Sequence, residues 1–135
     1  MWQIRPARQE DHDSALTLWS NAGMGRASEE EWRAIIAGPS ATLLVAAEGG
    51  KLIGTAVTSY DGWRAYVYHV AVDPGARQRG VAKALMAEAE KQLRQRGARR
   101  IFALVNENNT AGLALCAAAG YEPEGDLAFV REAGP

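Results

Sequence analysis

The order of hydrophobic and polar residues divides this chain into alternating strands and helices. Short apolar or alternating stretches predict strands at Ile4 and over residues 42–47, 52–60, 64–72, 99–105 and 126–131. Apolar residues recurring every three or four positions predict helices over residues 10–22, 78–96 and 110–119. A short fourth helix is predicted after Ser28, because Ser28 and Glu31 form a capping box and Gly38 and Pro39 would end it.

The connections between these elements indicate how the strands pair. Gly49 and Gly50 form a two-residue turn, so the strands on either side are expected to run antiparallel. The succession of strand 64–72, helix 78–96 and strand 99–105 is typical of a parallel crossover. The expected fold is therefore α/β, with one mixed sheet that is mostly antiparallel, one parallel strand pair and four flanking helices.

Length and composition predict a single globular domain over residues 1–135. The chain is 47% hydrophobic, and it has no apolar run near the ~18 residues that a membrane span needs. Its single cysteine, Cys116, excludes an internal disulfide and a multi-cysteine metal site. The first residues read as a strand rather than a secretory signal, so we expect a cytoplasmic protein of bacterial type.

Charge is balanced overall but unevenly distributed. The chain has 15 basic and 16 acidic residues, and the net charge of −1 argues against general nucleic-acid binding. Residues 76–100 hold eight basic and two acidic side chains, so this segment carries +6 and the rest of the chain −7. The asymmetry suits an anionic ligand and a cationic substrate, although the charges of residues 91–100 are equally well explained as a solvated helix face.

The junction between strand 64–72 and helix 78–96 has the chemistry of a phosphate site. Pro74 and Gly75 end the strand, and Gly80 lets a ligand approach the backbone. The first N–H groups of the helix have no partner within it and attract anions, to which Arg77 and Arg79 add formal positive charge. A phosphorylated ligand is therefore expected across the strand end and the helix start.

The exact spacing separates this loop from two other phosphate loops. Gly75-x-x-x-x-Gly80 begins like a P-loop, but Val81-Ala82 replaces its Gly-Lys-Ser/Thr ending, and no Gly-x-Gly-x-x-Gly is present. Arg77-x-x-Gly80-x-Ala82 instead resembles the pyrophosphate loop of the GNAT superfamily of acetyl-CoA-dependent N-acyltransferases. The flanking stretches 70–74, 109–111 and 119–121 extend the resemblance over nearly the whole chain, and residues 60–64 resemble the bacterial branch called YpeA-like.

The resemblance implies a splayed parallel strand pair with the pantetheine arm of acetyl-CoA lying in the gap. Backbone groups of the first strand would pair with pantetheine, the loop amides would hold the pyrophosphate, and Asn109 would bond a pantetheine amide from the other side. No metal is implied. The cofactor-binding residues expected on this basis are Val70, Ala71, Val72, Arg77, Gln78, Arg79, Gly80, Val81, Ala82 and Asn109.

The catalytic residues depart from the family pattern. Cys116 stands where many members have a tyrosine that protonates the leaving thiolate, so it is either a thiol donor or a small packing residue. Tyr66 stands where some members have a glutamate base; a tyrosine is a poor base near neutral pH but can position a water. By strand alternation Tyr68 should share its face, while His69 should point to the other face; a histidine is suited to act as a general base near neutral pH, and the alternative role of His69 is to pack against a helix.

The leading hypothesis is an N-acetyltransferase that forms a ternary complex of acetyl-CoA and a small-molecule or peptide amine, as a monomer or homodimer. The alternatives are a CoA-binding module with weak catalysis, and a nucleotide-phosphate binding domain. Residues 23–26 are either a lid over the acceptor groove or a plain connector. Neither a nucleic acid nor a membrane is expected as partner, and the sequence leaves the acceptor amine open.

Overall fold

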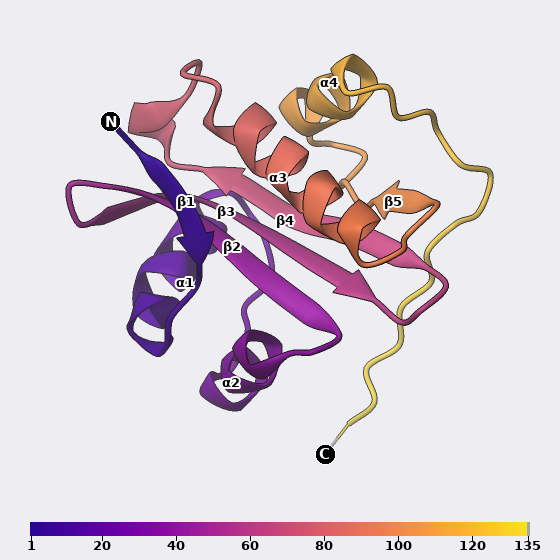
Figure 1. Cartoon of the computed structure of the whole chain (residues 1–135), viewed down its shortest axis with the longest axis horizontal. Helices are drawn as coiled ribbons and strands as arrows, with labels where there is room; N and C mark the ends of the chain where they lie inside the picture. Colours follow the sequence, from indigo (N-terminus) through magenta and orange to yellow (C-terminus); the bar gives the residue numbers. More distant parts are fainter. Residues whose placement is uncertain (135) are drawn as a thin grey trace.

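A five-stranded sheet lies between two helical layers in the computed structural model, which describes residues 1–134 (Figure 1). The strands are β1 (Gln3–Pro6), β2 (Ala41–Glu48), β3 (Lys51–Tyr60), β4 (Ala65–Val72) and β5 (Ile101–Ala103). The helices are α1 (His12–Asn21), α2 (Glu29–Ala37), α3 (Val81–Gln95) and α4 (Thr110–Ala118). Two short 3-10 turns, Gln9–Asp11 and Pro74–Ala76, precede α1 and α3.

The sheet has the mixed topology that the sequence predicts. Its strands lie in the order β1-β2-β3-β4-β5, and each pair from β1 to β4 is antiparallel. The pair β4–β5 is parallel, because α3 returns the chain to the same end of the sheet. Consecutive strands are therefore neighbours throughout, and β5 forms one edge.

Alternation along the strands divides the core into two parts. Leu44, Ala56 and Val67 point toward α3 and pack with Leu85 of that helix. The residues between them, such as Val57, point to the opposite face and pack with α1 and α2. Figure 1 shows this arrangement, with α3 on one side of the sheet and α1 and α2 on the other.

Two local features follow from particular residues. The capping box at the start of α2 is confirmed, since Ser28 Oγ accepts from the Glu31 N–H at 3.1 Å and Glu31 accepts from the Ser28 N–H at 2.8 Å. Gly54 allows α3 to lie close to β3, because a Cβ there would come within 2.9 Å of the Leu85 Cδ1 atom. The start of α3 is thereby held against the middle of the sheet.

The C-terminal part of the predicted pattern is wrong in two places. Strand 99–105 shortens to the three residues of β5, and residues 126–131 form no strand. An extended segment becomes a strand only where a neighbour takes its backbone hydrogen bonds. Here Leu127, Phe129 and Val130 are 79%, 90% and 91% exposed, so the segment has no such neighbour within residues 1–134. Among residues 1–134, no helix is long and apolar enough to cross a membrane.

Candidate functional site

The pairing of the two parallel strands stops partway along β4, and we call the unpaired edge of β4 beyond Val67 the gap. The two strands are paired from Ala65 to Val67, and the Leu104 N–H donates to the Val67 carbonyl at 2.9 Å. Beyond this point β4 continues to Val72 while β5 has ended. Because the Asp73 N–H turns toward β3 and donates to the Ile53 carbonyl, alternation turns the backbone groups of Val70 and Val72 toward the gap.

A bulge at His69 lies beside this gap. His69 has a φ of +49°, which is rare for a residue with a side chain, and the pairing of β3 with β4 shifts between Thr55 and Val57. The expectation that Tyr68 and His69 point to opposite faces is therefore wrong, since their rings meet edge to face at 5.6 Å between centroids. The His69 ring does pack against a helix, with its centroid 4.8 Å from that of Trp19 in α1.

Both histidines of the chain hold the connection between α1 and α2. His12 Nε2 lies 2.8 Å from the Ala27 carbonyl oxygen, and His69 Nε2 lies 3.0 Å from the Gly25 carbonyl oxygen. Because a carbonyl only accepts, each Nε2 carries a proton in these contacts. The His69 Nε2 is therefore a donor here, and not a free base facing a substrate.

The loop between β4 and α3 leaves backbone N–H groups and space free. Asp73 stabilises its start by accepting from the Gly75 N–H at 3.1 Å. Gln78 and Gly80 have φ values of +63° and +82°, which is why α3 begins at Val81 and not at the predicted Gln78. No side chain caps α3, and a Cβ on Gly80 would meet nothing within 4 Å. The start of α3 therefore has the uncapped N–H groups and the open space that the predicted phosphate site requires.

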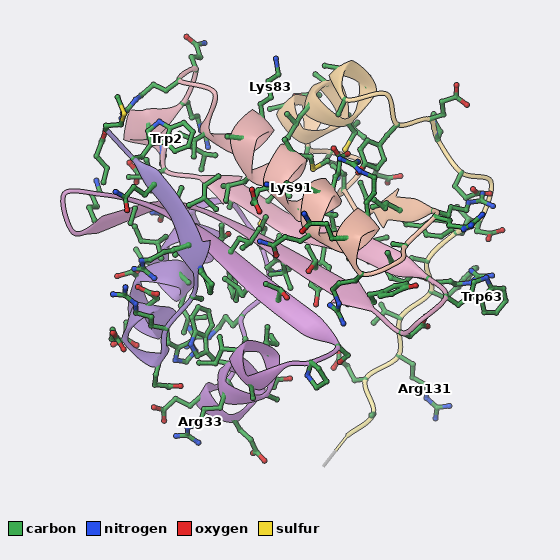
Figure 2. The ribbon with its side chains drawn as sticks, in the orientation of Figure 1. Trp2, Arg33, Trp63, Lys83, Lys91 and Arg131 are labelled. Atoms are coloured by element: carbon green, nitrogen blue, oxygen red, sulfur yellow. The ribbon has the colours of Figure 1, made fainter. Side chains whose placement is uncertain are left out.

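The two arginines of this loop differ in their surroundings. Arg79 donates from both guanidinium nitrogens to the two carboxylate oxygens of Glu48, at 2.9 and 2.5 Å. This bond lowers the pKa of Glu48 to about 2 and raises the pKa of Arg79. Arg77 is exposed and makes no ion pair within residues 1–134. Lys83 projects from the start of α3 and adds a further positive charge (Figure 2).

The far side of the gap is formed by the elements after β5. Asn109 caps α4, with its Oδ1 accepting from the Gly112 N–H at 2.9 Å, so its side-chain NH₂ group remains able to donate. Cys116 packs in part against the core beside α3, and burial, followed by the nearby Glu90, raises its thiol pKa. Tyr121 donates to Glu90 at 2.6 Å, and burial raises its pKa. Cys116 therefore stays a neutral thiol near pH 7.

The structure does not bring the two predicted catalytic residues together. Tyr66 stacks on Phe102 of β5, with ring centroids 5.3 Å apart, while Val67 beside it points toward α3. Tyr66 thus lies on the face opposite to Cys116, and the two could act only from different sides of a ligand in the gap. Trp63, which precedes β4, projects outward at the rim of the molecule and is 75% exposed (Figure 2). Among residues 1–134, no three His, Cys, Asp or Glu side chains are placed to hold a metal.

Sequence reasoning missed three contacts of this site. Trp19 Nε1 donates to Thr55 Oγ1 at 2.8 Å, Thr55 Oγ1 donates to the His69 carbonyl at 2.9 Å, and Glu48 binds Arg79. These partners lie 36, 14 and 31 residues apart. A pattern along the chain carries no signal for such pairs.

Comparisons with known proteins agree with this geometry. The model of the Acetyltransferase (GNAT) family matches residues 4–121. The acetyltransferase plu1384 of Photorhabdus laumondii is 35% identical over 123 residues, which cover 89% of this chain and 86% of that protein.

Two solved structures share the fold at low sequence identity. A transcriptional regulator from Bacillus halodurans is similar with a TM-score of 0.84 and 17% identity, over 98% of this chain and 100% of that one. A Clostridium acetobutylicum protein described as a predicted acetyltransferase, crystallised with acetyl-CoA, has a TM-score of 0.80 and 13% identity, over 97% and 96% of the two chains.

Proposed function

The chain belongs to the Acetyltransferase (GNAT) family, and we propose that it is one N-acetyltransferase domain that moves the acetyl group of acetyl-CoA onto a primary amine. The observation that carries the proposal is the gap between β4 and β5, which opens beside the uncapped start of α3. The gap supplies backbone partners for an extended amide-bearing arm, and the helix start supplies N–H donors for a pyrophosphate. Acetyl-CoA carries both groups in one molecule.

The main predicted cofactor residues take defined roles in this proposal. Val70 and Val72 offer backbone groups to the pantetheine, and the Asn109 NH₂ group donates to it from the other side. The N–H groups of the loop and of the first turn of α3 face the pyrophosphate. Arg77, which is free of ion pairs within the described residues, supplies the first positive charge.

The reaction is a balanced acyl transfer through a complex of both substrates. The amine nitrogen forms a bond to the carbonyl carbon, the carbon–sulfur bond breaks, and the amine loses a proton while the thiolate of CoA gains one. A water held by Tyr66 would take the first proton. The second comes from Cys116 or from solvent.

A CoA-binding module with weak catalysis is the second candidate. It is favoured by Cys116 and Tyr66, which replace the tyrosine and the glutamate that the family resemblance leads one to expect. Both candidates bind CoA, so ligand binding alone does not separate them.

Two measurements test the proposal and separate these candidates. We expect acetyl-CoA and CoA to raise the melting temperature of the protein and ATP to leave it unchanged. We then expect a panel of small amines and peptides to stimulate thiol release, with the acetylated product identified by mass spectrometry. Binding without product for any amine favours the module, and absence of CoA binding contradicts both candidates.

A further inference from the structure

The buried hydroxyl of Thr55 connects α1 to the bulge of β4. Thr55 is 0% exposed and Trp19 is 2% exposed. Trp19 Nε1 can only donate and the His69 carbonyl can only accept, so the single hydroxyl proton of Thr55 must point to His69. The chain of two hydrogen bonds therefore has one fixed direction, from α1 through β3 to β4.

The peptide group that Thr55 holds is the one that carries the Val70 N–H. Within residues 1–134 the only cis peptide bond is that before Pro39, so the bond between His69 and Val70 is trans. In a trans peptide the C=O and N–H groups lie in the same plane and point in opposite directions. A hydroxyl that fixes the His69 carbonyl on the side of β3 therefore turns the Val70 N–H toward the gap between β4 and β5.

His69 needs such restraint because its backbone conformation is unfavourable. A φ of +49° on a residue with a side chain persists only where its surroundings enforce it. Two contacts do so: the Thr55 hydroxyl holds its carbonyl, and the Gly25 carbonyl holds its ring. Of these, only the first fixes the peptide plane directly.

We propose that Thr55 is a positioning residue for acetyl transfer, which aims the Val70 N–H at the thioester oxygen through the His69–Val70 peptide plane. This inference rests on the proposed function. During attack by the amine that oxygen takes on negative charge, and a fixed N–H donor stabilises it without having to reorient. Thr55 itself touches neither substrate. Trp19 supports it by filling one acceptor position of its hydroxyl.

The test is Thr55→Val, which keeps the side-chain shape and removes the hydroxyl. We expect kcat to fall by roughly 10- to 100-fold, the scale of a misplaced or lost oxyanion donor, with the acetyl-CoA dissociation constant changed by less than about threefold. Thr55→Ser keeps the hydroxyl and should recover most of the lost kcat. Trp19→Phe removes the donor to Thr55 and leaves the bond to His69, so its loss of kcat should be smaller.

Thr58→Val is the matched control. Thr58 lies on the same strand and is 2% exposed, and within residues 1–134 the only hydrogen bond of its hydroxyl is a long one, 3.5 Å, to the Thr42 carbonyl. Thr58→Val should share any general cost of removing a buried hydroxyl and leave kcat near that of the wild type. Equal kcat values for Thr55→Val and Thr58→Val overturn the proposal, as does failure of Thr55→Ser to recover activity.

The amide resonance of Val70 gives a readout that does not depend on turnover. In free Thr55→Val this resonance should move away from its wild-type position, because the His69–Val70 peptide plane is released, and it should lose its response to acetyl-CoA, while neither changes in Thr58→Val. A Val70 resonance in Thr55→Val at its wild-type position contradicts the inference. If the wild type binds no acetyl-CoA, the proposed function fails, and the position of the Val70 resonance in the free variants still decides whether Thr55 fixes this peptide.

Discussion

Residues 1–100 and residues 101–134 form the two sides of the proposed cofactor gap, and they differ in how deeply they are packed. Every buried hydrophobic side chain belongs to the first part, from Ala15 to Ala98. From Ile101 to Gly134 no residue is buried, and α4 has Leu113 44% exposed although nearly all its residues are apolar.

This difference separates a rigid wall from a loosely packed one. The first wall has a bulge enforced by buried hydrogen bonds and a helix start held against β3. The second wall consists of the short strand β5 and the exposed helix α4, which is capped by Asn109 and contains Cys116. Acetyl-CoA binding should therefore order the first wall little and the second wall more, so most of the entropy cost of ordering falls on the second wall.

The largest expected effect on ligand binding is on the rigid wall, at Gly80. In Gly80→Val the added side chain fills the open space where the pyrophosphate is proposed to lie, so acetyl-CoA affinity should fall by about 100-fold or more, which corresponds to about 2.7 kcal/mol. Isothermal titration measures the loss.

Gly62→Val is the control for this variant. Gly62 also has a positive φ, of +98°, and open space around its Cβ position, but it lies in the turn before β4. Gly62→Val should lower the stability of the protein about as much as Gly80→Val does and leave its acetyl-CoA affinity unchanged. Unchanged affinity in a folded Gly80→Val protein would refute the assignment of the pyrophosphate loop.

The packing difference itself can be measured with two leucines. Leu85, 0% exposed, lies between α3 and the sheet, so Leu85→Ala should lower the free energy of unfolding by about 2–5 kcal/mol. Leu113→Ala on α4 should cost about 0.5 kcal/mol or less, because Leu113 is 44% exposed. Urea unfolding compares the two. Equal losses would mean that α4 is packed as firmly as α3 and would remove the contrast between the two walls.

The contrast also bears on how much the sequence predicts. The antiparallel strands, the capping box at Ser28 and the parallel crossover follow from local patterns, and the structure confirms them. The bulge at His69 and the isolation of residues 126–131 were missed, because each depends on which distant segments lie alongside. The proposed phosphate loop is predicted from its spacing, but the Glu48 partner of Arg79 comes from another strand, 31 residues away, and no local pattern indicates it.

Arg77 should matter more than Arg79 for the nucleotide part of the ligand. Arg77 is exposed and able to contact phosphate. Arg77→Ala should therefore weaken CoA binding by about 1.5–3 kcal/mol and leave the affinity for a pantetheine fragment unchanged. Arg79→Ala should weaken CoA binding less, because Arg79 is already hydrogen-bonded to Glu48. Titrations with both ligands decide this. If a variant loses as much affinity for the pantetheine fragment as for CoA, its arginine acts through folding and not through contact with phosphate.

On the loosely packed wall, removing the thiol of Cys116 should have a modest effect. If Cys116 is a packing residue, Cys116→Ala should keep kcat within about tenfold, short of the 10²–10⁴-fold loss expected when a general acid is removed. Steady-state kinetics at saturating acetyl-CoA measure kcat, and titration checks that the cofactor still binds. A thousandfold fall with normal affinity would show instead that the thiol donates the proton.

The smallest expected effect is the contribution of the exposed pair of Glu48 and Arg79 to stability. The pKa of Glu48 is lowered in the folded protein to about 2, from its usual value of 4.5, chiefly by its hydrogen bonds to Arg79. The folded state thus binds this proton less readily than the unfolded state, so the stabilisation is complete above pH 4.5 and is lost as pH falls toward about 2. Because the pair is solvent-exposed, salt should weaken it further.

We expect the unfolding free energy of wild type to exceed that of Glu48→Gln at neutral pH and to converge with it in acid. Glu107→Gln, which removes an exposed carboxylate without an ion pair in residues 1–134, should show no such convergence. A wild-type advantage over Glu48→Gln that stays constant down to pH 2 would mean that the bond to Arg79 does not stabilise this loop.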